Sequence, residues 1–322
     1  MSSNAKGAVL ALIAFAVFAT HDVFVKVLGA TYSPIQIVFF SVLFSFPLAT
    51  VMLMRDAKPG NLLPRHPWWM ALRTAASVAT AISAFYAFTV LPLAQTYAIL
   101  FAAPLLITIL AIPILGEVVR LRRWLAVIVG LTGVFVVLRP GATDLTLGHA
   151  AALTAAVGSS VASIVVRRIG ADERPVVMLL YPMMANFVLM GIGLAFVYVP
   201  MPIEHLGLVA LVAAFAWTAG RCIIAAYQAG EAAIIAPMQY SQIIWATLFG
   251  VLYFEESMDA ATIIGAGIII ASGLYIVLRE SRSDTSETPV LRTRSRHETG
   301  TYMRAGPLLR LMGRHPDNKS DS

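Results

Sequence analysis

Apolar runs of about twenty residues alternate with short polar connections along most of the chain. A bilayer core about 30 Å thick needs about 20 helical residues, each rising 1.5 Å. The connections hold turn-forming stretches such as YSP, PGN and RPG. We therefore predict an all-α membrane protein with ten transmembrane helices. The predicted helices cover residues 7–30, 34–54, 67–90, 92–114, 120–138, 147–166, 176–199, 205–227, 232–254 and 259–278.

The two halves of this pattern resemble each other. A shift of 141 residues places Lys26 over Arg167, and a shift of 139 residues places Glu117 over Glu256. Each half holds five predicted helices, an odd number, so the second copy must cross the membrane in the opposite direction. Inverted repeats of this kind place a solute site near the membrane midplane, where the repeats meet.

Three segments follow from the repeat and from a change in composition. We predict a first repeat over residues 1–145 and a second over 146–279. Residues 280–322 are polar, rich in Ser and Thr, and without helical periodicity, which predicts a disordered cytoplasmic tail.

Composition and charge agree with a membrane location. Hydrophobic residues make up 59% of the chain and charged residues 12%, against about 25% charged in a soluble domain. The Lys/Arg bias of short loops predicts a multi-pass membrane protein with both termini in the cytoplasm. The cations on the predicted inner side are Lys6, Arg55, Lys58, Arg65, Arg120, Arg122, Arg123, Arg167, Arg168 and Arg174.

Charge, cysteine count and motifs limit the kinds of partner and cofactor that we expect. The net charge of +6 comes from residues that flank apolar runs or lie in the tail, so we expect lipid and no nucleic acid as the partner. The single cysteine, Cys222, excludes an intramolecular disulfide and a zinc motif. No phosphate-binding loop is present, so we expect no cofactor and transport driven by a gradient or by exchange. The sequence is consistent with either a monomer or a homodimer.

Three polar residues stand together in the first predicted helix. Asp22 and Lys26 are four residues apart and share one helix face, so we expect them to pair. A charge at the centre of a membrane helix costs about 2.5–3.5 kcal/mol, which makes Asp22 a candidate functional acid. Lys26, near the helix end, alternatively extends to the headgroups. His21 is either a proton relay, since an imidazole exchanges protons near neutral pH, or a helix-contact residue.

Further candidates lie in the third, fourth, eighth and ninth predicted helices. Arg73 and Arg221 each lie about two turns from the predicted inner face, where an arginine either lines a vestibule or extends to the headgroups. Aromatic residues gather in the same helices and favour a lined cavity over isolated packing positions. The aromatic candidates are Tyr86, Tyr97, Trp217, Tyr240 and Trp245.

Two long motifs resemble the EamA-type permeases of the drug/metabolite transporter superfamily. They are PILGEVVRLRRWLAVIVGLTGVFVVLRPG and FEESMDAATIIGAGIIIASGLYIVLRE, and the resemblance covers residues 7–280. FATHDVFVK is similar to the D-x-x-x-K motif of a bacterial subgroup associated with uptake of riboflavin or S-adenosylmethionine. APMQYSQIIW is similar to the same subgroup around Tyr240 and Trp245. The chain departs at Ser41, where many relatives carry arginine, and at Gln95, where an acid is common.

The resemblance implies a secondary transporter of a small organic solute in the bacterial inner membrane. Riboflavin is the first expectation, because Lys26 would neutralise Asp22 and leave little negative charge for a cationic substrate. S-adenosylmethionine uptake and metabolite export are the alternatives. An intramembrane enzyme is disfavoured, since no nucleophile or metal set accompanies His21 and Asp22. A scaffold with a signalling tail is disfavoured too, since the tail holds no recognisable module.

Overall fold

The computed structural model describes residues 3–54, 62–117, 119, 121–141, 144–170, 172–229, 235–257 and 259–282, and the regular elements in these ranges are all helices. The predicted tail, residues 280–322, lies outside them from residue 283 onward, and its first three residues are helical, because the last helix continues to Arg282. Arg55, Lys58 and Arg120 also lie outside the described ranges. In the first half the helices are α1 (Ser3–Gly29), α2 (Pro34–Met54), α3 (Pro67–Val90), α4 (Leu93–Leu100), α5 (Ala103–Leu115) and α6 (Leu121–Leu138). In the second half they are α7 (Leu147–Ile169), α8 (Pro175–Val197), α9 (Ile203–Ala229), η1 (Ala236–Tyr240), α11 (Ser241–Phe254) and α12 (Ala260–Arg282).

Eight segments of the described chain are helical, long and apolar enough to cross a membrane. They comprise α1 to α3, α4 with α5, and α6 to α9. α11 has 14 residues and the apolar part of α12 runs over Ala260–Ile276, so both fall below that length. The structure thus supports an all-helical membrane protein with eight clear spans.

The fourth and ninth predicted helices are interrupted. The helix expected over 92–114 breaks at Phe101 and Ala102, between α4 and α5. Pro104 lies in the first turn of α5, where its missing N–H removes a bond that would continue α4. Pro237 lies in the first turn of η1, which precedes α11 in the same way. Interrupted helices of this kind occur in transporters that bind a solute near the membrane midplane.

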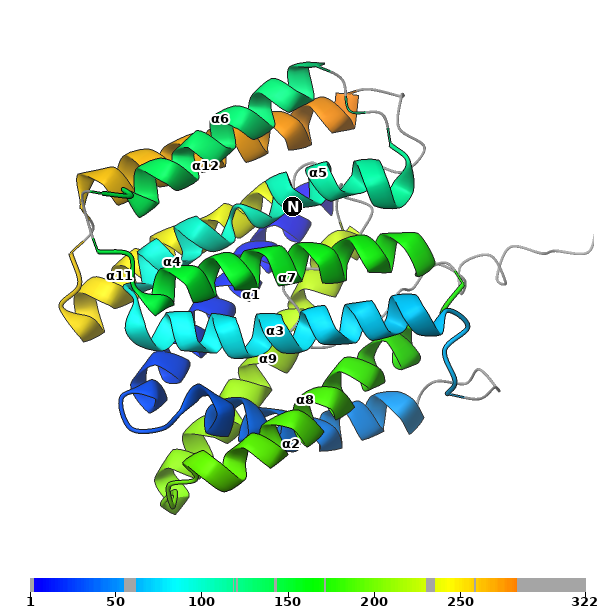
Figure 1. Cartoon of the computed structure of the whole chain (residues 1–322), viewed down its shortest axis with the longest axis vertical. Coiled ribbons are helices and arrows are strands. Elements are labelled where there is room, and N and C mark those ends of the chain that lie inside the picture. Colours follow the sequence, from blue (N-terminus) through cyan, green and yellow to red (C-terminus); the bar gives the residue numbers. More distant parts are fainter. Residues whose placement is uncertain are drawn as a thin grey trace, which may run out of the picture.

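Helix packing relates the two halves by an approximate two-fold axis. α1 packs extensively on α9, and its counterpart α7 packs extensively on α3. α6 packs on α12, and α2 on α8, so each of these pairs joins counterparts (Figure 1). α1 ends at the left of Figure 1 and α7 ends at the right, so the counterparts run in opposite directions. The backbones of α6 and α12 touch, because a Cβ built on Gly133 would lie 2.8 Å from the carbonyl oxygen of Gly265.

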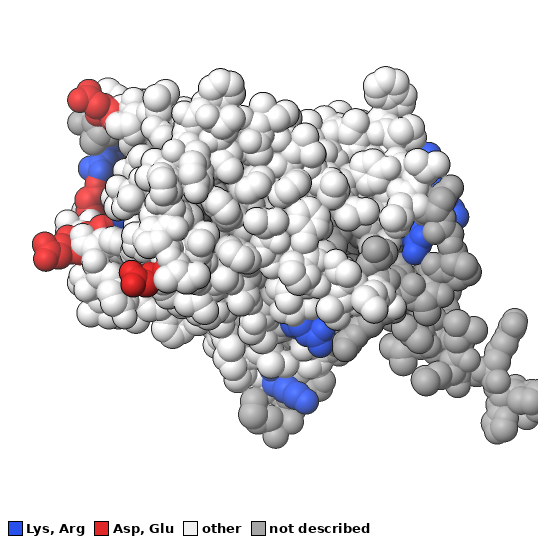
Figure 2. Space-filling view, turned by 90° about the horizontal axis from the view of Figure 1, so that it is seen from below, with Lys and Arg blue, Asp and Glu red and all other residues white. Residues whose placement is uncertain are grey.

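Charged side chains separate toward the two ends of the bundle. Figure 2 shows acidic side chains gathered at one end and basic side chains toward the other, with a broad uncharged surface between them. Glu204 lies in the first turn of α9, and Glu255 and Asp259 lie in the connection between α11 and α12. Large apolar side chains in the middle of the helices are exposed, such as Leu189 of α8, which is 51% exposed. That surface matches the hydrocarbon of a bilayer.

Candidate functional site

A cavity lies among α1, α2, α3, α8 and α9, where the two halves meet. It is open on one side, and the space within and in front of it, open solvent included, amounts to about 720 Å³. Its lining is mostly apolar and includes Phe85, Met178 and Met183. A mostly apolar lining with a few polar groups is typical of a small-molecule site.

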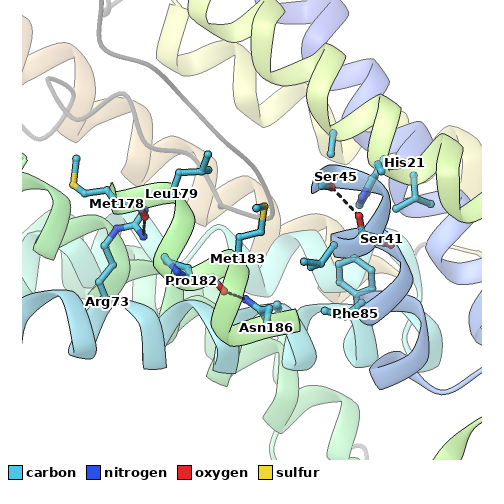
Figure 3. A pocket seen from close by; sticks show the side chains of 16 residues that line it. His21, Ser41, Ser45, Arg73, Phe85, Met178, Leu179, Pro182, Met183 and Asn186 are labelled. Carbon is cyan, nitrogen blue, oxygen red and sulfur yellow. Dashed lines mark hydrogen bonds between the residues drawn. The ribbon is translucent and has the colours of Figure 1, made fainter. Parts of the chain in front are cut away.

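Polar groups lie at both ends of this cavity and between them. Figure 3 shows His21 near Ser41 and Ser45 at one end, Arg73 at the other, and Asn186 between them. Nη1 of Arg73 donates a hydrogen bond to the carbonyl oxygen of Met178 at 2.6 Å, which fixes the guanidinium beside the cavity. A bound solute would therefore meet a cation at one end and an imidazole at the other.

Two buried oxygen atoms of the lining have no hydrogen-bond partner among the described residues. They are Oγ of Ser41 and Oδ1 of Asn186, whose residues are 8% and 7% exposed. The amide nitrogen of Asn186 donates to the carbonyl oxygen of Pro182 at 2.9 Å, so its oxygen is turned away from its own helix. A buried polar atom without a partner costs about 1–3 kcal/mol. A solute with hydrogen-bond donors would remove that cost.

Asp22 belongs to a buried hydrogen-bonded network beside the cavity. Its Oδ1 lies 2.7 Å from Nδ1 of His21, and its Oδ2 accepts a hydrogen bond from the hydroxyl of Tyr97. Nε2 of Gln242 donates to the same hydroxyl at 3.0 Å. The network thus joins α1 and α4 of the first half to α11 of the second. It brings together three predicted site residues, His21, Asp22 and Tyr97, at the inner edge of the site.

The expected pair between Asp22 and Lys26 does not form. Nζ of Lys26 lies 2.8 Å from Oε1 of Glu256 and donates to the carbonyl oxygen of Leu91 at 2.6 Å. Leu91 follows the last residue of α3, where carbonyl groups lack helical partners and attract cations. The ammonium group therefore extends toward the acidic end of the bundle, away from Asp22. The prediction that Lys26 pairs with Asp22 was therefore wrong, although the two residues are one turn apart on the same helix.

The remaining predicted site residues lie outside the described lining of this cavity. The hydroxyl of Tyr240 lies against Gly273 of α12, where an added Cβ would be 1.8 Å away. Trp245 stacks on Phe249 with ring centroids 6.4 Å apart. Tyr86 and Trp217 are half-buried, and Arg221 is exposed. Of the predicted arginines, the structure thus brings Arg73 to the cavity, and of the predicted aromatic residues it brings Tyr97 to the network.

Ser41, Ser45, Asn186 and the two methionines line the cavity without having been predicted. Ser41 and Ser45 are four residues apart on α2, and Asn186 stands alone in the apolar sequence of α8. An isolated amide in a membrane helix is a usable sequence signal, because it needs a partner inside the bundle. The methionines carry no such signal.

Comparison with known proteins gives consistent results. The profile of the EamA-like transporter family matches residues 5–139 and again 146–278. The S-adenosylmethionine uptake transporter of Rickettsia prowazekii is 25% identical over 86% of this chain and 94% of its own length. The pseudopaline exporter CntI of Pseudomonas aeruginosa is 26% identical over 83% of this chain and 94% of its own. A solved crystal structure with 18% identity covers 87% of this chain and 99% of its own, with a TM-score of 0.53, and therefore supports the fold.

Proposed function

Since the chain belongs to the EamA-like transporter family, we propose that it takes up S-adenosylmethionine, or a closely similar cationic nucleoside, across the bacterial inner membrane. The cavity with polar groups at both ends carries this proposal. The curated relatives named as S-adenosylmethionine uptake transporters support it, since they align over most of both chains. Riboflavin, the first expectation from the sequence, has no support among these relatives, and we replace it.

The position of Lys26 removes the electrostatic objection to a cationic substrate. That objection assumed that Lys26 neutralises Asp22, whereas its ammonium group is held by Glu256. The carboxylate of Asp22 instead contacts His21 and Tyr97. Lys26 therefore does not occupy the carboxylate, and Asp22 is free of the lysine partner that would exclude a sulfonium cation.

The other parts of the proposed substrate match the remaining lining. Arg73 would bind the carboxylate of the amino-acid moiety by charge-assisted hydrogen bonds. The oxygens of Ser41 and Asn186 would accept hydrogen bonds from amino or hydroxyl groups, which satisfies both atoms. Phe85 and the neighbouring methionines would pack on a purine ring, because both side-chain types are polarizable and apolar.

Counterflow in proteoliposomes tests the proposal. Vesicles loaded with unlabelled S-adenosylmethionine should accumulate the labelled compound from outside. S-adenosylhomocysteine, which lacks the sulfonium charge, should compete more weakly, and riboflavin should not compete. Asn186→Leu, which removes the acceptor and keeps a similar volume, should accumulate less of the labelled compound, and Arg221→Gln, outside the lining, should accumulate as much as the wild type. Absence of accumulation by folded wild-type protein, with accumulation of a different solute, would overturn the substrate assignment.

Metabolite export is a second candidate function. The similarity to the pseudopaline exporter favours it, because its identity and coverage are close to those of the uptake transporters. The two directions of transport are separated by comparing the rates of efflux and uptake. Both rates are measured in sealed vesicles in which the orientation of the protein is known.

We also propose ten spans, with α11 and α12 crossing the membrane and the basic end of the bundle in the cytoplasm. α12 packs along α6, which is long enough to span the membrane. This packing supports the proposal that α12 spans the membrane as well. Cysteines in place of Arg65 and Glu204, both exposed, mark the two ends. In a Cys222→Ala background, an impermeant reagent added to intact cells should label position 204 and not position 65. The reverse pattern would invert the topology.

A further inference from the structure

A second ion pair, at the basic end of the bundle, mirrors the pair of Lys26 and Glu256. Nη2 of Arg167 lies 2.5 Å from Oε1 of Glu117. Both pairs are mostly buried, with side-chain exposures of 13% and 16% for Lys26 and Glu256, and of 5% and 13% for Arg167 and Glu117. We call them the acidic-end pair and the basic-end pair.

The two pairs are counterparts under the internal repeat. Lys26 and Arg167 lie near the carboxyl ends of α1 and α7, and Glu117 and Glu256 directly follow α5 and α11. Each pair takes its cation from one half and its carboxylate from the other. The acidic-end pair therefore joins α1 to α11, and the basic-end pair joins α7 to α5. An inverted repeat places two such cross-links at opposite faces of the membrane.

The backbone presents both carboxylates in the same way. Gly116, with φ of 72°, and Glu255, with φ of 54°, each end the preceding helix in the left-handed conformation. The next residue then donates its N–H to a carbonyl six residues back, Glu117 to Ala111 and Glu256 to Gly250. This helix ending turns each glutamate side chain back toward the bundle.

The acidic-end pair is also connected to the site network. Oε2 of Glu256 accepts a hydrogen bond from the backbone N–H of Leu93 at 2.9 Å, at the start of α4. Leu93 lies one helical turn before Tyr97, and Lys26 lies one turn after Asp22. Glu256 thus connects the two helices that hold the Asp22–Tyr97 hydrogen bond, α1 through Lys26 and α4 through Leu93.

We propose that the two ion pairs are alternating gates of the transport cycle. Breaking the acidic-end pair opens the cavity toward that face, and breaking the basic-end pair opens it toward the other. Each pair is a cross-link between the halves, so a rocking motion that separates one pair keeps the other in contact. The proposal rests on the transport activity of the family and not on the identity of the substrate.

Cysteine accessibility tests the gates without any substrate. Thr108 on α5 and Thr247 on α11 are matched reporter positions, since each lies nine residues before the glutamate of its pair. Each is replaced by cysteine in a Cys222→Ala background, together with Glu256→Gln or Glu117→Gln. Labelling by an impermeant thiol reagent is measured in right-side-out and inside-out vesicles.

Glu256→Gln should raise labelling at position 247 from the acidic-end face by about fivefold or more, the size of a usual coupling between two states. It should leave position 108 unchanged or less accessible. Glu117→Gln should do the reverse. Glutamine still accepts the backbone hydrogen bond, so only the charge pair is lost. The control Glu204→Gln, which neutralises an exposed carboxylate at the acidic end, should change neither reporter.

A structural role for the pairs gives a different result. Equal increases at both positions, or no change at either, would overturn the proposal. The exchanged double variant Lys26→Glu with Glu256→Lys should return labelling toward the wild-type value, and failure to do so would also count against it. If a glutamine variant does not fold, Glu256→Asp and Glu117→Asp shorten the reach of the carboxylate and are judged by the same outcomes.

Discussion

The hydroxyl group of Tyr97 donates a hydrogen bond to the carboxylate of Asp22, between residues 75 positions apart in the chain. Asp22 lies on α1, and Tyr97 lies on α4, the short helix that precedes the break in the fourth span. The bond is buried and continues to Gln242 of the second half. The carboxylate is thereby fixed at the junction of the two repeats.

Replacing Asp22 by asparagine should impair transport more than folding. The amide fills the same volume but carries no charge for a cationic solute or for His21. We expect the transport rate to fall tenfold or more, in line with about 1.5–3 kcal/mol for a hydrogen bond to a charged group. Flux in proteoliposomes and elution from a sizing column measure the two effects. Wild-type transport with an unchanged pH profile would make the carboxylate structural.

Replacing Lys26 by methionine should destabilise the fold through Glu256. Loss of one member of a buried ion pair costs about 3 kcal/mol, because the remaining charge has no partner. Adding Glu256→Gln should recover most of that loss, whereas adding Asp22→Asn should not. Thermal unfolding of the single and double variants makes the comparison. Recovery by Asp22→Asn would show that Lys26 pairs with Asp22 after all.

Removing the buried acceptors of the cavity should weaken solute binding. Asn186→Leu and Ser41→Ala each delete an oxygen that has no partner among the described residues. We expect the dissociation constant of the transported solute to rise about tenfold, or about 1.4 kcal/mol, with little change in the unfolding temperature. Arg221→Gln, at an exposed position outside the lining, is the control. Unchanged affinity in both variants would place the solute elsewhere.

Enlarging Gly273 should destabilise the bundle by pushing on Tyr240. A Cβ at position 273 would lie 1.8 Å from the tyrosine hydroxyl, so Gly273→Ala should cost about 1–3 kcal/mol. Tyr240→Phe removes the hydroxyl and should recover part of this loss while transport continues. A large transport defect in Tyr240→Phe alone would instead give this ring a role in the site.

Replacing Glu255 by glycine should stabilise the protein. Glu255 is exposed and holds a φ of 54°, a conformation that glycine adopts without steric cost. We expect a gain of about 0.5–1 kcal/mol, seen as a higher unfolding temperature. Gly116→Ala, at the counterpart position, should produce a loss of similar size. A decrease in stability for Glu255→Gly would indicate that its side chain makes a contact of its own.

The sequence predicted the helical elements because lipid imposes a strong rule. Each membrane helix satisfies its own backbone, so a run of about 20 apolar residues is sufficient to identify it. The shared spacing of Lys26 with Arg167, and of Glu117 with Glu256, also revealed the repeat. His21 and Asp22 were singled out because a polar group is costly inside an apolar helix, and Tyr97 because aromatic residues gather in the same predicted helices.

The partners of these residues could not be read from the chain. Helical spacing allows Lys26 to reach Asp22, but it says nothing about the open carbonyls at the end of α3 or about Glu256. Likewise, aromatic composition does not separate Tyr97, which binds the site carboxylate, from Tyr240, which packs on α12. Local periodicity and lipid solvation determined the helices and their repeat. The packing of distant helices decided which buried charges and hydroxyl groups meet, because each long side chain pairs with the nearest complementary group that the bundle presents.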